Sequence, residues 1–251
     1  MKTLTIANQK GGAGKTTLTA HLAFAAQQAK KRVLLIDADP QGSLSLIFNT
    51  AVADPAMLAT SDLFSTTTDK PLCKIDRYLS LVPADETLFD LLSSPVSTLE
   101  RLRENLKQFS GRFDLCLIDT PPERNSLLIG ALAAADFVIT PMTIGLLEQS
   151  GVRRLFDSIE GTRGALNPRL QHLGILLMKT NSRSSKERAM IEELRSLYGA
   201  RILNTSLPER AAVRNSINSR CAVWTNPRGT THQAAAAEWR SACSDILASL
   251  N

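Results

Sequence analysis

The sequence KGGAGKTT, residues 10–17, stands between an apolar run at Leu4–Asn8 and a helical pattern at Thr16–Lys30. Its three glycines let the backbone curl so that successive N–H groups point at one anion. The helix that follows directs the positive end of its dipole at the same anion. In a loop of this kind, Lys15 reaches the β- and γ-phosphates of a nucleotide and the Thr16 hydroxyl coordinates Mg²⁺. The motif therefore predicts a nucleotide site directly after the first strand.

Apolar runs alternate with helical patterns along the rest of the chain. The expected strands are nearly continuous in Leu, Ile and Val, as parallel strands covered on both faces are. They are Leu4–Asn8, Arg32–Asp37, Leu79–Pro83, Phe113–Asp119, Phe137–Pro141, Leu173–Lys179 and Ala200–Leu203. The expected helices are Thr16–Lys30, Ser97–Phe109, Glu123–Ala134, Leu147–Ile159, Ser184–Tyr198 and Thr231–Leu250. This alternation predicts an α/β fold, with a doubly wound, mostly parallel sheet and helices on both faces.

The domain organisation follows from length and composition. No joint rich in Pro, Gly and Ser divides the chain, and its 251 residues fit one large α/β domain. We therefore expect a single domain over residues 1–251. The segment from Asn49 to Pro71 is rich in Thr, Ser, Asp and Ala and has weak periodicity. We interpret this segment as a surface excursion with one short helix at most.

The composition excludes several classes of protein. Hydrophobic residues make up 43% and charged residues 21% of the chain, which is typical of globular proteins. The most apolar stretch, residues 127–142, contains Asp136 and Pro141, so we expect no membrane span. The amino terminus reaches Asn8 and Gln9 before a signal-peptide core could form, and we expect a cytoplasmic protein. The spacing of the four cysteines and three histidines predicts neither a disulfide framework nor a zinc site.

Two further strands end in carboxylates. The sequence VLLIDADPQG places Asp37 and Asp39 at the end of one strand, and FDLCLIDTPP places Asp119 at the end of another. Ligands of doubly wound sheets bind at the carboxyl ends of the strands, where carboxylates hold magnesium waters or orient an attacking water. An Asp pair in this position is otherwise a turn or capping pair, and the phosphate loop favours the functional interpretation. We expect Asp119 to hold Mg²⁺ through a water.

The phosphate loop departs from the strict G-x-x-x-x-G-K-[ST] pattern. Gln9 stands at the first glycine position and Lys10 follows it. This KGGxGKTT form is the deviant Walker motif. Together with DADPQG and DTPP it resembles the ParA/MinD family of P-loop ATPases, and the ParA branch most. The resemblance covers the chain from Lys2 to the last helix, and it is loose from Asn49 to Asp76 and after Cys221.

The resemblance implies ATP and Mg²⁺ as cofactors and gives roles to several residues. Asp39 would lie near the nucleophilic water, and Asp37 would support the magnesium side. Asn181 would contact adenine, and the loop at Pro208 would pack on it. Lys10 would reach across a homodimer to the partner's phosphates, so that two ATP molecules are sandwiched between protomers and dimerisation depends on ATP.

The expected site residues fall into three overlapping groups. The ATP-binding residues are Lys10, Gly11, Gly12, Ala13, Gly14, Lys15, Thr16, Thr17, Asn181 and Pro208. The metal-binding residues are Thr16, Asp37 and Asp119. The catalytic residues are Lys10, Lys15 and Asp39.

Charge is unevenly distributed along the chain. Residues 1–150 carry 14 Lys and Arg against 16 Asp and Glu, whereas residues 151–251 carry 15 against 8, a net charge of +7. An Arg-rich basic part suggests a nucleic-acid partner, the alternative being a solvated basic surface. The candidate contacts to DNA phosphates, chosen by region and charge alone, are Arg195, Arg214 and Arg220, from a set that also includes Arg188, Arg210 and Arg240.

Among the branches of the family, the residues favour a small ParA-type partition ATPase. No cysteine pair suits an iron–sulfur cluster, and the phosphate loop begins too early for a preceding helix-turn-helix domain. We expect a protein that dimerises on ATP, binds DNA non-specifically and hydrolyses ATP when a ParB-like adaptor stimulates it. Its cargo would be a plasmid, a chromosome region or a protein assembly, and it would associate with the nucleoid.

Two alternatives stay open. A MinD-like ATPase that cycles on a membrane to regulate division or polar placement needs a basic amphipathic carboxy-terminal helix. The tail has an apolar stripe at Trp239, Ala242, Ile246 and Leu250, but its charges are too acidic for anionic lipid. We therefore expect the stripe to dock on the protein and do not expect a membrane partner. A metabolic P-loop ligase is a weaker alternative, because no substrate motif is present.

Overall fold

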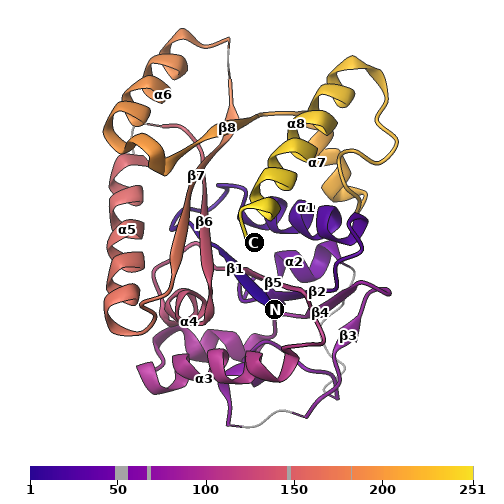
Figure 1. Cartoon of the computed structure of the whole chain (residues 1–251), viewed down its shortest axis with the longest axis vertical. Helices are drawn as coiled ribbons and strands as arrows, with labels where there is room; N and C mark the ends of the chain where they lie inside the picture. The colour runs from indigo at the N-terminus through magenta and orange to yellow at the C-terminus, as the bar shows by residue number, and fades with distance from the viewer. Residues whose placement is uncertain (49–55, 67–68, 146–147, 182, 251) are drawn as a thin grey trace.

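An eight-stranded sheet forms the centre of the computed structural model, which describes residues 1–48, 56–66, 69–145, 148–181 and 183–250 (Figure 1). The strand order is β3-β4-β2-β5-β1-β6-β7-β8, and every neighbouring pair is parallel except β3 with β4. The strands are β1 (Lys2–Ile6), β2 (Val33–Asp37), β3 (Cys73–Lys74), β4 (Leu79–Val82), β5 (Leu115–Asp119), β6 (Phe137–Met142), β7 (Gln171–Thr180) and β8 (Ile202–Pro208). The expected fold class is confirmed.

Seven of these strands correspond to the seven expected ones. Their bounds differ from expectation by up to two residues at either end, and the last strand differs most. We expected Ala200–Leu203, whereas β8 runs from Ile202 to Pro208. A 3₁₀ turn occupies Gly199–Arg201, and the middle of β8, residues 204–206, is polar and not fully buried, so the strand carries no continuous apolar run. The two-residue β3 is too short to leave a pattern, and it pairs antiparallel with β4 at the edge of the sheet.

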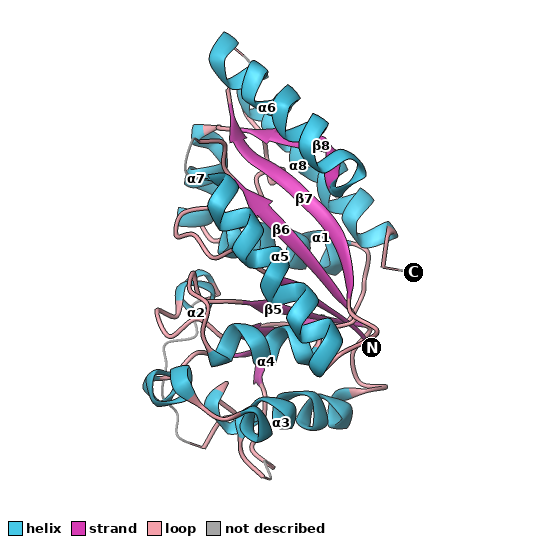
Figure 2. Cartoon of the chain, turned by 90° about the vertical axis from the view of Figure 1, so that its left-hand side faces the viewer, coloured by secondary structure: helices cyan, strands magenta, loops and turns pink. Residues whose placement is uncertain are grey.

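Helices cover both faces of the sheet (Figures 1 and 2). They are α1 (Lys15–Gln28), α2 (Ser43–Ile47), α3 (Val96–Leu106), α4 (Ser126–Ala134), α5 (Glu148–Ala165), α6 (Ser185–Tyr198), α7 (Ala211–Asn218) and α8 (Gly229–Ala248). Successive side chains of one strand point to opposite faces of the sheet. Leu35 of β2 packs with α1 and α8 in one core cluster, whereas Leu34 and Ile36 pack with α3 and α4 in another. This arrangement explains why the strands read as continuous apolar runs.

Some helix boundaries differ from expectation for local reasons. We expected a helix over Glu123–Ala134, but α4 begins only at Ser126, because Asn125 caps it by accepting the Leu128 N–H at 3.1 Å. The helix expected over Leu147–Ile159 continues to Ala165, and Leu147 lies outside the described residues. Two short helices, α2 and α7, were missed because they span only 5 and 8 residues.

The segment from Asn49 to Pro71 is more than a surface excursion, and this expectation was wrong in part. Its described residues include a 3₁₀ helix, η1 (Ser61–Phe64), and the side chains of Leu58, Leu63 and Phe64 are buried in the core. The expected short helix is therefore present, and it contributes apolar side chains. Residues 49–55 and 67–68 lie outside the described part of the chain.

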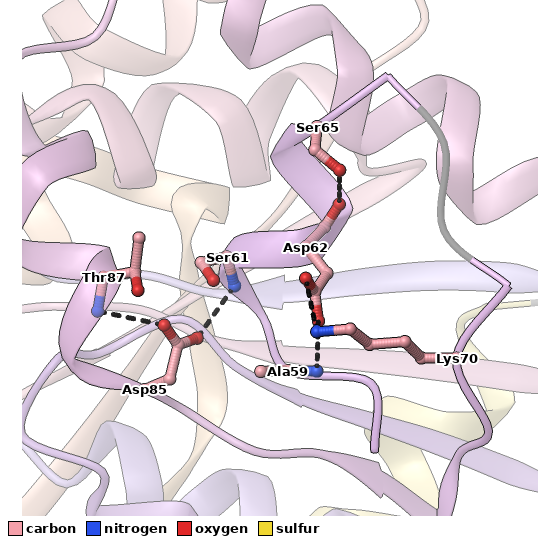
Figure 3. Close-up of polar contacts among 7 residues, drawn as sticks. All are labelled: Ala59, Ser61, Asp62, Ser65, Lys70, Asp85 and Thr87. Atoms are coloured by element: carbon pink, nitrogen blue, oxygen red, sulfur yellow. Dashed lines mark hydrogen bonds and ion pairs between the residues drawn. The ribbon is translucent and has the colours of Figure 1, made fainter. Parts of the chain in front are cut away.

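Two aspartates attach this segment to its surroundings (Figure 3). Asp85 accepts the backbone N–H groups of Ser61 and Thr87, both at 3.0 Å, and so joins η1 to a second 3₁₀ helix, η2 (Glu86–Ser93). Asp62 accepts the Ala59 N–H at 3.0 Å and two hydrogen bonds from the Lys70 ammonium. Asp85 thereby ties the segment to η2, whereas Asp62 joins two parts of the segment itself.

Helix α8 docks on the body of the protein, as its apolar stripe predicts. Trp239, Ala242, Ile246 and Leu250 are all buried, in the core cluster that also contains α1. Within the described residues, no helix is both long and apolar enough to cross a membrane. The four cysteines are free thiols, and Cys116 is a fully buried apolar residue of β5, as expected.

Candidate functional site

The phosphate loop connects the end of β1 to the first residue of α1. Gly12 and Gly14 adopt left-handed backbone conformations, with φ of +73° and +93°, and Gly14 directly precedes the helix. Residues with a side chain rarely adopt such angles, which explains two of the three glycines. A Cβ atom on Gly14 would lie 2.9 Å from the Cε atom of Met178, so the end of β7 packs closely against the loop. The loop therefore has the curled backbone that its sequence predicts.

Lys15 is buried beneath this loop. Its ammonium donates a hydrogen bond to the Lys10 carbonyl at 3.3 Å. Burial lowers the pKa of Lys15, and the charges of Asp119 and Asp39 partly offset this effect. A buried cation favours an anionic ligand that brings several oxygens, such as a polyphosphate, whereas the two carboxylates partly compensate its charge.

Asp37 and Asp119 lie side by side at the ends of β2 and β5, where the strand register pairs them directly. Both side chains are fully buried. Burial, together with repulsion from neighbouring carboxylates, raises the pKa of Asp37 to about 6 and that of Asp119 to about 7. Two carboxylates this close favour a cation between or beside them.

The hydrogen bonds of the two carboxylates differ. Asp37 Oδ2 accepts both the backbone N–H and the hydroxyl of Ser45, at 2.8 and 2.7 Å, and its Oδ1 accepts the Asp39 N–H at 3.3 Å. Asp119 Oδ1 accepts the Thr19 hydroxyl at 3.2 Å, whereas its buried Oδ2 has no hydrogen-bond partner within the described ranges of the chain. Asp119 therefore has an oxygen available to a cation or its water, and Asp37 is already held by protein donors.

These oxygens suit Mg²⁺, which takes a few protein oxygens and completes its shell with water and phosphate. A hydrogen bond from the Thr16 side chain reaches Asp119, so the two expected metal-binding residues are in contact. In the described part of the chain, no group of three or more His, Cys, Asp and Glu side chains is arranged to hold a metal ion. Thr19 and Ser45 were missed, although Thr19 lies one helical turn after Lys15 on the same face of α1.

Asp39 lies at the rim of the same site. It lines a cavity of about 310 Å³ together with the phosphate loop, Gln41, Ser43, Pro122 and Lys179. Its Oδ1 accepts the Gln41 N–H at 3.0 Å. Burial raises its pKa, and this effect is opposed by that hydrogen bond and by the charge of Lys15. The structure thus places Asp39 in the same cavity as the phosphate loop, and its role toward an attacking water stays a prediction.

A second cavity, of about 340 Å³, adjoins the first and shares Gly14, Thr17 and Lys179 with it. Pro208 lines it, as expected of a residue that packs on a base. Asn181 does not line it. Its Oδ1 accepts the Arg183 N–H at 3.1 Å, and its role at the base stays a prediction. Lys179 and Trp239 also line this second cavity, although the sequence placed them in an expected strand and in the apolar stripe and gave them no role at the site.

Lys10 occupies the outer side of the loop. Lys10 is exposed, and its backbone N–H donates a hydrogen bond to Asn8 Oδ1 at 3.0 Å. An exposed position is compatible with a role at a second protomer, which stays a prediction.

The three arginines expected at DNA do not form one cluster. Arg195 belongs to α6 and donates to the Asn204 carbonyl at 3.1 Å, whereas Arg214 belongs to α7 and Arg220 follows it. Helices α6 and α7 lie well apart in Figure 1. Arg214 also lines the second cavity, and its guanidinium lies 3.8 Å from the Glu209 carboxylate.

Arg210 and Arg220 contrast in the groups around them. Arg210 forms a bidentate ion pair with Glu238, at 2.6 and 3.2 Å, so its charge is already compensated. Arg220 is exposed and has a left-handed backbone, with φ of +55°. Of these two arginines, Arg220 is therefore better placed to contact an external anion.

Comparison with known proteins gives consistent matches. A family model described as an AAA domain matches residues 1–172. The chromosome partitioning protein ParA of Caulobacter vibrioides (strain NA1000 / CB15N) is 32% identical over 225 residues, which cover 85% of this chain and 82% of that protein. The chromosome-partitioning ATPase Soj of Thermus thermophilus is 32% identical over 216 residues, which cover 83% and 81%.

A solved structure agrees over nearly the whole chain. It is described as cobyrinic acid a,c-diamide synthase from Mycobacterium smegmatis with bound ADP and magnesium. It superposes with a TM-score of 0.80 at 26% sequence identity, covering 98% of this chain and 94% of that one.

Proposed function

The chain belongs to the ParA/MinD family of P-loop ATPases, and on that premise we propose that it is a Mg²⁺-dependent partition ATPase. It binds ATP in the two adjoining cavities, hydrolyses it to ADP and phosphate, and uses this cycle to segregate or position a cargo. One observation carries the proposal. Among the residues that the structure describes, the buried Oδ2 of Asp119 has no hydrogen-bond partner, and it lies at the foot of a phosphate loop that already contains Lys15 and Thr16.

The roles of the residues follow from their positions. Lys15 neutralises the β- and γ-phosphates from below the loop, and backbone N–H groups of the loop bind the same oxygens. The Thr16 hydroxyl and Asp119 hold the magnesium side, with Asp37 in support. The metal, when bound, neutralises the charge that develops on the phosphates. Asp39 orients the attacking water at the rim of the cavity.

Lys10 couples the nucleotide to a second copy of the chain. Its exposed position lets it reach the phosphates of a partner, so that two ATP molecules hold a homodimer together. The dimer doubles the basic carboxy-terminal part of the chain and binds DNA non-specifically at the nucleoid. Hydrolysis, stimulated by a ParB-like adaptor, then releases the protein from DNA.

The partition role is preferred over the two alternatives. A MinD-like membrane cycle needs an amphipathic helix with an available apolar face, whereas the apolar face of α8 is buried against the protein. No motif of the sequence favours a metabolic ligase role, although the similar solved structure is described as a synthase. The curated relatives that carry partition names match at higher identity.

The test compares three variants with the unaltered protein in the presence of Mg²⁺. Calorimetry measures ATP binding, and the amount of ADP formed measures hydrolysis. We expect Lys15→Ala to lose ATP binding, because the β- and γ-phosphates lose the lysine beneath them. We expect Asp39→Ala to bind ATP and to stop hydrolysing it. Asp90→Ala, which removes an exposed carboxylate outside both cavities, serves as the control and should behave as the unaltered protein. Micromolar ATP affinity in Lys15→Ala, or normal hydrolysis by Asp39→Ala, would contradict the proposal.

A further inference from the structure

Lys179 has an unusual backbone at the end of β7. Its φ is +54°, in the left-handed region that side-chain-bearing residues seldom occupy. The pairing of β7 with β8 shifts register between Met178 and Thr180, on either side of this residue. Strained backbone of this kind clusters at functional sites, where it points a side chain in a required direction.

The side chain of Lys179 crosses from β7 to the phosphate loop. Its ammonium donates a hydrogen bond of 2.8 Å to the carbonyl of Gly12, a residue 167 positions earlier in the chain. An ammonium group has three N–H donors. Within the described residues, the Gly12 carbonyl is the one hydrogen-bond acceptor of this group, so two donors remain for a ligand.

The charge of Lys179 is not compensated by the protein. In the described part of the chain, no carboxylate oxygen lies within 4 Å of its ammonium, whereas Arg210 and Arg214 in the same cavity each face a glutamate. A carbonyl neutralises no charge, and a phosphate oxygen does. Lys179 is exposed, so water solvates its charge without a ligand, and a phosphate oxygen bound where the two cavities meet would neutralise that charge.

The position of Lys179 indicates which phosphate it would meet. Lys179, Gly14 and Thr17 are the lining residues common to both cavities. The first cavity holds Lys15 and Asp39, at the end of the nucleotide where the terminal phosphates bind, and the second holds Pro208, at the base. The group that joins these two ends of a nucleotide is the phosphate next to the ribose.

We propose that Lys179 is a nucleotide-binding residue whose ammonium binds the α-phosphate of ATP or ADP while it stays hydrogen-bonded to Gly12. The proposal rests on the proposed function, since it assumes that ATP occupies these cavities. It adds to Lys15 a second lysine of the same protomer, with a separate role. Lys15 serves the phosphates that react, whereas Lys179 serves a phosphate that is equally present in substrate and product.

The experiment measures the dissociation constants of ATP, ADP and adenosine for the full chain and for Lys179→Gln. A glutamine amide keeps an N–H donor but carries no charge, so phosphate attraction is removed. Its side chain is one atom shorter than that of lysine, and the adenosine affinity shows whether the loop keeps its support. We expect ATP and ADP to weaken to a similar degree, about tenfold or more, because a charge-assisted hydrogen bond is lost. Adenosine affinity should stay unchanged, because adenosine carries no phosphate for Lys179 to bind.

Two controls separate this proposal from its premise. Lys186→Gln removes the same charge from an exposed residue of α6 outside both cavities, and its nucleotide affinities should match the unaltered protein. Equal ATP and ADP affinities in Lys179→Gln and Lys186→Gln would overturn the proposal, as would a loss confined to ATP or a loss that includes adenosine. Failure of the unaltered protein to bind ATP would instead overturn the proposed function.

Discussion

Single residues of the nucleotide site are held by partners far away in the sequence. Asp119 contacts Thr19 across 100 positions, and Lys179 contacts Gly12 across 167. A motif therefore shows which residues bind phosphate, but not which residues position them. The backbone conformation of the loop is equally restrictive, because Gly14 has a left-handed φ.

Gly14→Ala should destabilise the protein and weaken ATP binding, because alanine is strained at a φ of +93°. The cost should be about 1–3 kcal/mol in the free energy of unfolding. The nearby Met178 side chain is flexible and can move aside, so backbone strain accounts for most of this cost.

The matched control is Gly161→Ala in α5, where φ is not positive and nothing lies within 4 Å of the added methyl group. That change should stabilise the protein by about 0.5–1 kcal/mol, since alanine is the better helix residue. Urea unfolding measures both, and changes of the same sign would contradict the prediction.

His21 gives a prediction about pH. It is fully buried in α1. Its Nδ1–H donates to the Thr17 carbonyl at 2.8 Å, and its Nε2 accepts the Val223 N–H at 3.2 Å. Burial lowers its pKa from 6.5 to about 4, so the unfolded chain takes up a proton at a higher pH than the folded one. Stability from this residue is complete above pH 6.5 and is lost as pH falls toward 4, by about 2 kcal/mol at pH 5.

The comparison is with His21→Gln, whose side chain keeps a donor and an acceptor but does not titrate. Between pH 7 and pH 5, this variant should lose about 2 kcal/mol less stability than the unaltered protein. His172, whose pKa is also lowered to about 4 by burial, contributes equally to both proteins and cancels. Parallel stability profiles of the two proteins would refute the assignment.

At the scale of elements, the two 3₁₀ helices η1 and η2 depend on one carboxylate. Asp85→Ala removes acceptors from the N–H groups of Ser61 and Thr87 (Figure 3). We expect a loss of about 1–2 kcal/mol in the free energy of unfolding. Amide hydrogen exchange should also quicken at Ser61 and Thr87.

Asp90→Ala is the matched control, since it removes an exposed carboxylate from the same 3₁₀ helix, η2. It should change stability by less than about 0.5 kcal/mol. If the two variants unfold at the same urea concentration, Asp85 does not hold these helices together.

The elements also show how far the sequence could be interpreted. Parallel strands buried on both faces, such as β2 and β5, are apolar throughout, so periodicity found them. The polar middle of β8 and the buried residues Leu58 and Leu63 follow no period, because tertiary packing alone places them. Likewise, the phosphate loop is visible as a local pattern, whereas Lys179 reaches the site through a bulge that leaves no local signature.

At the scale of the whole molecule, binding to DNA should be electrostatic. Arg220→Ala should weaken binding similarly on two unrelated duplexes, since a phosphate contact carries no sequence information. The slope of log affinity against log salt should flatten by about 0.9 for each protomer. Arg163→Ala, which removes an exposed arginine of α5, should leave the slope unchanged. Equal slopes in all three proteins would exclude Arg220 from the DNA surface.

The central claim is that ATP, bound at this loop and hydrolysed with the help of Asp39, controls the assembly of the chain. Light scattering of Asp39→Ala with Mg²⁺ measures this most directly. We predict twice the 27.3 kDa mass of the chain with ATP and the single mass with ADP. With ATP, the double variant Lys10→Ala, Asp39→Ala should return to the single mass. The same mass with both nucleotides, or a dimer that survives loss of the Lys10 side chain, would contradict the account.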